Sequence, residues 1–180
     1  MIRIALWRRF ALASTGLAIS AALLRGQLAD ALVTRGDEFL YRARPTEALK
    51  YYVRALTVDS TDAIAIDRLL FVSQLVRSRE GTESGIRLAT HYLRAHPEDD
   101  VLRMDRAMAL RADGRHADAL ADFERVGKSV RDGRALTFAG FEADALGWRK
   151  DAVSLWRAAE KQAPGLPAPR HALQREAGEK

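Results

Sequence analysis

The chain of 180 residues contains no cysteine. This excludes disulfide bonds, thiolate metal sites, a cysteine nucleophile and a lipidated cysteine, and it is compatible with a reducing or an oxidising compartment. Aromatic residues make up only 7% of the chain and there are five prolines, whereas 48% of residues are hydrophobic. Alanine and arginine are abundant. Because these two residues lose little side-chain freedom in helices, the composition predicts an all-α fold.

The sequence also has no concentrated positive patch. The formal net charge is +5, but Arg3, Arg8 and Arg9 lie within the first ten residues, so the remainder carries only 5 − 3 = +2. Binding of single-stranded nucleic acid requires a basic stripe with interleaved aromatic residues, and no such stripe is present. We therefore predict no nucleic-acid partner.

No motif for catalysis or for a cofactor is present. The chain has four histidines, His91, His96, His116 and His171. Their spacing does not match metal-ligand patterns, no serine lies in a nucleophile elbow, and there is no glycine-rich phosphate loop. The acidic triplet Glu98–Asp100 follows Pro97 and indicates helix capping rather than a calcium loop. We predict that the protein is not an enzyme and has no cofactor and no metal.

The longest apolar run extends from Phe10 to Leu24, between Arg9 and Arg25. A basic segment followed by such a run is typical of a signal peptide or a signal anchor. Fifteen helical residues rise about 22 Å against a hydrocarbon core of about 30 Å, which favours cleavage, near Ala22. Residues 4–7 add apolar length and the flanking arginines can reach the headgroups, which favours an uncleaved anchor. A buried first helix is the third alternative.

The two leading alternatives place the rest of the chain outside the cytoplasm, because the arginines before the run keep the N-terminus inside. The bias toward alanine and arginine indicates a bacterial source. We therefore expect an inner-membrane protein with a single span through residues 10–24 and a periplasmic domain. The alternative is a soluble periplasmic protein, cleaved near Ala22.

A repeat of small and bulky residues follows the apolar run. Counted from Ala29, the positions 8, 11, 20, 24 and 27 are occupied by Gly36, Phe39, Ala48, Tyr52 and Ala55. This pattern resembles the 34-residue unit of the tetratricopeptide repeat (TPR) family, which has small residues at positions 8, 20 and 27. Two antiparallel helices approach closely only where side chains are small. The resemblance implies an all-α, short TPR-like α-solenoid of about four helical hairpins, preceded by one apolar helix.

Weaker copies of the unit continue along the chain. The unit from Gly133 has Gly140, Ala152, Trp156 and Ala159 in register, and the unit from Asp100 has Ala107, Ala119 and Phe123. Arg103 and Arg106 depart from the pattern and predict a more exposed first helix there. Residues 66–99 match least well, and Ala63 to Ala65 fall outside the repeat frame. The predicted division is an N-terminal segment 1–28, a repeat domain 29–164 with units 29–62, 66–99, 100–132 and 133–164, and a capping helix with a polar tail, 165–180.

In the TPR family the first helices of the hairpins line a groove that receives a partner segment. Carried over residue by residue, the resemblance implies a groove containing Val33, Asp37, Leu40, Tyr41, Leu70, Arg77, Met104, Met108, Arg111, Phe141 and Asp144. The matching positions carry no Lys or Asn, so the carboxylate clamp of some family members is not expected. Methionine suits a surface that adapts to its partner. The alternative is that Met104, Met108 and Phe141 only pack between units.

The sequence therefore predicts a scaffold or assembly factor, tethered to the membrane or exported, that binds other proteins in a membrane complex. The alternative is a single-span accessory subunit embedded in such a complex, with its repeats on the extrinsic part. Small residues in the apolar run, such as Ala11 and Gly16, would then permit close approach to a neighbouring helix.

Overall fold

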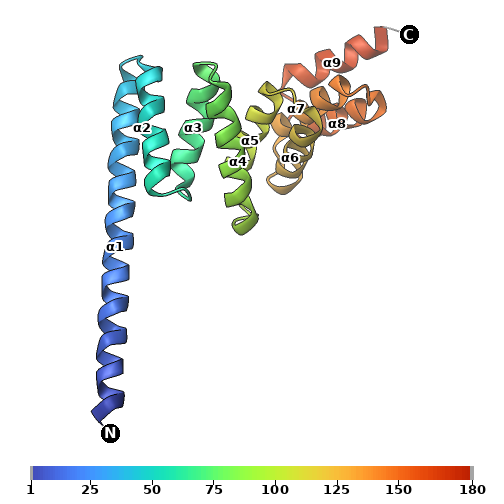
Figure 1. Ribbon diagram of the computed structural model, residues 1–180. Helices are drawn as coiled ribbons and strands as arrows, with labels where there is room; N and C mark the ends of the chain where they lie inside the picture. Colours follow the sequence, from blue (N-terminus) through green and yellow to red (C-terminus); the bar gives the residue numbers. More distant parts are fainter. Residues whose placement is uncertain (1, 179–180) are drawn as a thin grey trace. The chain divides into compact units, whose positions relative to one another are not determined.

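The computed structural model describes the backbone of residues 2–178 and the side chains of residues 20–176 and 178. Over this range the chain forms nine helices and no strand (Figure 1), which confirms the all-α prediction. The helices are α1 (Ile2–Tyr41), α2 (Pro45–Val58), α3 (Ala63–Leu75), α4 (Arg79–Ala95), α5 (Asp100–Ala112), α6 (His116–Ser129), α7 (Gly133–Ala145), α8 (Arg149–Gln162) and α9 (Pro167–Gly178). The chain divides into two compact units, residues 1–66 and 67–180.

The first unit contains the hairpin of α1 and α2. A Cβ atom at Gly36 would lie 2.5 Å from Cε1 of Tyr52, so the two helices meet where α1 has no side chain. Tyr52 is fully buried, and its hydroxyl donates a hydrogen bond of 2.6 Å to Oδ1 of Asp37. Pro45 begins α2, at a position where its missing N–H costs no helical hydrogen bond. The predicted small-against-large packing is therefore present in this hairpin.

The same contact recurs in the second unit, in the hairpin of α7 and α8. A Cβ atom at Gly140 would lie 2.3 Å from Nε1 of Trp156, and the Trp156 side chain is fully buried. In the hairpin of α5 and α6 the equivalent residues are Ala107 and Phe123, both with no exposed surface. Helix α9 packs on α8, with Ala172 buried and Arg149 Nε 2.8 Å from Glu176 Oε2.

The turns inside the hairpins fix the repeat register. Residues with positive φ occur at Ala43 (56°), Arg77 (56°), Gly114 (76°) and Gly147 (77°), in the turn between the two helices of each hairpin. Each is the fifteenth residue of its hairpin when the second hairpin starts at Ala63. The structure thus starts this hairpin three residues before the Ile66 expected from the sequence. The three extra residues lie in α4, which has 17 residues against 14 in α2, α6 and α8.

The expectation that Arg103 and Arg106 make α5 more exposed is wrong. Arg103 is only 5% exposed, and its Nη2 donates to the carbonyl oxygen of Pro97 at 2.7 Å. Arg106 forms a bidentate pair with Asp122 of α6, at 2.8 and 2.6 Å. A guanidinium can be buried when planar acceptors satisfy it, and Asp122 of α6 does this for Arg106. Oδ1 of Asp122 also lies 3.8 Å from Nη1 of Arg103. The predicted capping by the acidic triplet is confirmed, because Asp99 accepts the N–H of Leu102 at 2.9 Å.

The apolar run forms part of α1, which continues without a break through the predicted boundary at residue 28. The side chains of residues 10–19, on which the predicted span depends, lie outside the described residues. Leu23, Leu24 and Leu28 are exposed by 64%, 65% and 53%. Within the described part of the chain, no helix combines the length and apolar character needed to cross a membrane.

Substituting Gly140 by alanine tests the close helix contact. The new methyl group would overlap the fully buried Trp156 ring, so we expect the free energy of unfolding to fall by about 1–3 kcal/mol in urea denaturation followed by circular dichroism. Gly165→Ala is the matched control, because a Cβ atom there meets nothing within 4 Å, and its effect should stay within about 0.5 kcal/mol. Equal effects of the two substitutions would contradict this packing.

Candidate partner-binding face

The structural register places three residues of α5 at positions 5, 9 and 12 of its hairpin, which the TPR resemblance assigns to the inward face. Met104, Met108 and Arg111 occupy these positions and are half-buried. Val101, at position 2, is 76% exposed. One helical face therefore carries these side chains, as the sequence predicts for α5.

On α3 the corrected register changes the predicted residues. Counted from Ala63, positions 9 and 13 are Phe71 and Leu75, which are 54% and 55% exposed. The expected residue Leu70 is instead fully buried, and a Cβ atom at Gly85 of α4 would lie 2.7 Å from its Cδ2. Arg77 lies in the turn after α3 and is exposed. Leu70 thus belongs to the core, and sequence reasoning missed Phe71 and Leu75.

These observations define an apolar face on two consecutive first helices of the second unit. It consists of Phe71, Leu75, Val101, Met104 and Met108. Exposed apolar side chains are unremarkable singly, but a group of them on two neighbouring helices is suited to contact with another molecule. The apolar face is the candidate binding surface of this unit.

The groove residues predicted on α7 and α1 do not belong to the apolar face. Phe141 is half-buried, with its ring centroid 5.5 Å from that of Trp156 in an edge-on contact, so it packs partly within its own hairpin. Asp144 is half-buried. In the first unit, Val33 is buried and Leu40 is half-buried, whereas Tyr41 is 94% exposed. Asp37 holds the Tyr52 hydroxyl, so its carboxylate serves the hairpin itself.

Arg111 is held by α7 rather than presented to a partner. Its Nε lies 3.0 Å from Oε1 of Glu142, and its guanidinium carbon is 5.1 Å from the ring centroid of Phe138. The other carboxylate oxygen of Glu142 lies 2.7 Å from Nδ1 of His116 on α6. Glu142 is only 2% exposed. This cluster joins α5, α6 and α7, so Arg111 has a structural role.

A second charged cluster joins α3 and α5 beside the apolar face. Asp105 of α5 shares a side-chain hydrogen bond with Asp67 of α3, and we call these two residues the acid pair. Burial, followed by the charges of Asp67 and Asp99, raises the pKa of Asp105 from 3.8 to about 7, while Arg68 acts in the opposite direction. The Nη1 of Arg68 lies 2.7 Å from Oδ2 of Asp67. Asp105 therefore retains a proton at neutral pH for part of the time.

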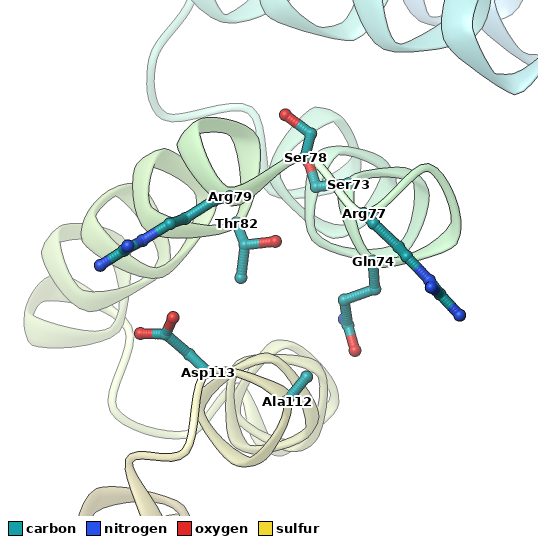
Figure 2. Close-up of a pocket in the computed structure, with 8 residues that line it drawn as sticks. All are labelled: Ser73, Gln74, Arg77, Ser78, Arg79, Thr82, Ala112 and Asp113. Carbon is teal, nitrogen blue, oxygen red and sulfur yellow. The ribbon is translucent and has the colours of Figure 1, made fainter.

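A pocket of about 310 Å³ opens where α3 and α5 end and α4 begins (Figure 2). It is lined by Ser73, Gln74, Arg77, Ser78, Arg79, Thr82, Ala112 and Asp113. In Figure 2 the side chains of Arg77 and Arg79 point in different directions, away from the space between the helices. The buried Ser73 hydroxyl faces α4, because a Cβ atom at Gly81 would lie 2.3 Å from its Oγ. The pocket therefore has no converging charge for an anion.

The arrangement offers contact surface and one acid pair. Among the described residues, no group of three His, Asp or Glu side chains is placed to hold a metal ion. The chemistry that the apolar face supports directly is reversible burial of apolar side chains.

Asp105→Asn tests the acid pair through the pH dependence of stability. The pKa of Asp105 in the folded chain, about 7, lies above 3.8, so the folded chain binds more protons than the unfolded chain between these values. The contribution of Asp105 to stability should therefore fall as pH rises from about 4 to about 7. Asparagine cannot ionise, so the variant should gain about 1–2 kcal/mol relative to wild type between pH 4.5 and pH 8, after allowance for partial exposure.

The measurement is urea denaturation at both pH values. Asp118→Asn, at an exposed carboxylate in the first turn of α6, is the control and should show no comparable pH dependence. A stability difference for Asp105→Asn that does not change with pH would contradict the raised pKa.

The chain matches no protein-family model and no curated protein sequence. It is similar in structure to MamA 41-end from Desulfovibrio magneticus RS-1, with a TM-score of 0.69 and 16% identity over 81% of each chain. A second similar structure, from a functional characterisation of Pseudomonas aeruginosa PilF, has a TM-score of 0.67 and 16% identity, covering 86% of this chain and 71% of that one. At these identities the likeness shows the fold, and it confirms a TPR-like α-solenoid.

Proposed function

We propose that the protein is a binding module that holds a segment of another protein on the apolar face. The observation that carries this proposal is the exposure of Phe71, Leu75 and Val101 at inward positions of consecutive first helices. Surface of this kind is costly to leave in water, and a partner segment would cover it. The half-buried Met104 and Met108 add flexible side chains that adapt to the shape of the partner.

The proposed mechanism is burial of two or three apolar side chains of the partner between α3 and α5. Each buried side chain contributes about 1.5–3 kcal/mol before the cost of association, so the expected binding is reversible. Regular helical hairpins suit this role because they hold the receiving side chains at fixed spacings. We propose no reaction on this face, since its chemistry is contact and charge.

We further propose that residues 10–24 attach the protein to the inner membrane, with the hairpins in the periplasm. Three observations support this. The run carries no charge and is flanked by arginines, and α1 passes unbroken from it into the first hairpin. Leu23 and Leu24 at the end of the run and Leu28 just after it are exposed. Export with cleavage near Ala22 is the alternative, and a subunit embedded in a larger membrane complex is compatible with the unbroken helix.

Site-specific photo-crosslinking tests the binding face. With p-benzoylphenylalanine at Phe71 or Val101 of the full chain in living cells, we expect one discrete adduct common to both positions, because both would touch the same partner. The matched control is Ser154, which is exposed on α8, the second helix of its hairpin. A probe at Ser154 should give no such adduct. Adding Met108→Ala to the Val101 probe should reduce the adduct several-fold. Equal adducts at Val101 and Ser154 would exclude the apolar face as the binding surface.

Intact mass and membrane extraction test the attachment. If the apolar run is an anchor, the mature protein retains its first 22 residues and stays in the membrane pellet after washing at alkaline pH. Leu17→Arg should release it, because an arginine within an apolar span costs about 2.5–3.5 kcal/mol. Leu155→Arg, on α8, is the control, and because it lies outside the apolar run it should leave the protein in the membrane pellet. Loss of the first 22 residues from the mature mass would exclude the anchor and the embedded subunit.

A further inference from the structure

The acid pair borders the apolar face, as the helical register shows. Asp67 precedes Phe71 and Leu75 by four and eight residues on α3, so the three side chains share one helical face. On α5, Asp105 follows Val101 by four residues and precedes Met108 by three. The hydrogen bond between Asp67 and Asp105 brings the two helices together at this point. A partner segment that covers the apolar side chains therefore also covers the two carboxyls.

The charges around the acid pair do not balance. The groups that act on Asp105 are the carboxylates of Asp67 and Asp99 and the guanidinium of Arg68. Two arginines in the first turns of α5 have other partners. Arg103 donates to the Pro97 carbonyl, and Arg106 pairs with Asp122. With all groups ionised, three negative charges meet one positive charge. Burial raises the pKa of Asp105 most, and this excess of negative charge raises it further.

Covering the pair with an apolar segment alone would remove it from water and increase the electrostatic cost. An acidic or phosphorylated segment would add to the repulsion. A lysine or arginine would lower the cost, because its cation balances the carboxylates while its aliphatic stem lies along apolar side chains. Charge complementarity therefore selects the occupant of the apolar face.

We propose that the apolar face binds a protein segment that carries a lysine or arginine with an apolar side chain on each side, its cation lying against Asp67 and Asp105. The inference rests on the proposed function as a protein-binding module. It specifies which kind of segment the module selects.

A peptide library with a defined central residue tests this. Three pools of 13-residue peptides, with random flanks and Lys, Leu or Glu fixed at the centre, are presented to the immobilised full chain at pH 7.5. We expect the Lys pool to be retained roughly tenfold more than the Leu pool and the Glu pool least, with apolar residues enriched three or four positions from the lysine. The double variant Asp67→Asn/Asp105→Asn should remove the Lys preference and keep binding of the Leu pool.

Asp118→Asn/Asp151→Asn, at exposed carboxylates on α6 and α8, is the charge-matched control and should keep the Lys preference. Circular dichroism confirms that each variant is folded. Equal retention of the Lys and Leu pools, with both lost in Phe71→Ala/Met108→Ala, would overturn this inference and leave the binding function standing. If no pool binds wild type better than Phe71→Ala/Met108→Ala, the proposed function fails, and the inference fails with it.

Discussion

The contact on which each hairpin depends is a large side chain pressed against a residue that has little or no side chain. Gly36 meets Tyr52 and Gly140 meets Trp156, with distances from a hypothetical Cβ atom of 2.5 and 2.3 Å. The contact sets how closely the two helices approach and therefore which residues of the first helix remain outside the core. In the hairpin of α3 and α4 the sizes are exchanged, since Leu70 of the first helix fills the space above Gly85 of the second. The exposed face of each first helix is thus a consequence of its core contact.

This exchange explains what the sequence predicted and what it did not. Where the small residue lies on the first helix, as at Gly36 and Gly140, the spacing alone predicts the hairpin. The second hairpin has no glycine in its turn, where Arg77 adopts a φ of 56°, and its small residue lies on the second helix. The turn glycine and the small residue on the first helix are the two signals that locate a hairpin in the sequence, and the second hairpin has neither. Burial of Arg103 and Arg106 was missed for a related reason. Asp122, which pairs with Arg106 and lies 3.8 Å from Arg103, belongs to another helix and is recognised only once the hairpin is folded.

The register error has a geometric consequence for the candidate site. A shift of three residues turns an α-helix by about 300°, which moves each assigned position about 60° around the axis. Counted from Ile66, Leu70 took position 5, which Asp67 occupies when the hairpin starts at Ala63. The same shift removed Phe71 from position 9, so this exposed residue was missed. The α5 residues keep the positions assigned from the sequence, because Ala107 fixes their register. Arg111 shows a further limit, because periodicity assigns a face but does not reveal that Glu142 and Phe138 of the next hairpin hold the side chain.

The two charged clusters of the second unit differ in how far the negative charge of their carboxylates is balanced. Glu142 is almost fully buried, pairs with Arg111 and shares a hydrogen bond with His116, so it strengthens the contact between neighbouring hairpins. The acid pair is left with more negative charge than Arg68 balances, at the contact between α3 and α5. In a stack of repeats each contact affects mainly its own neighbours, so this excess weakens one junction without unfolding the others. A cation that completes the acid pair would strengthen that junction, and binding would then be coupled to the stiffness of the stack at α3 and α5.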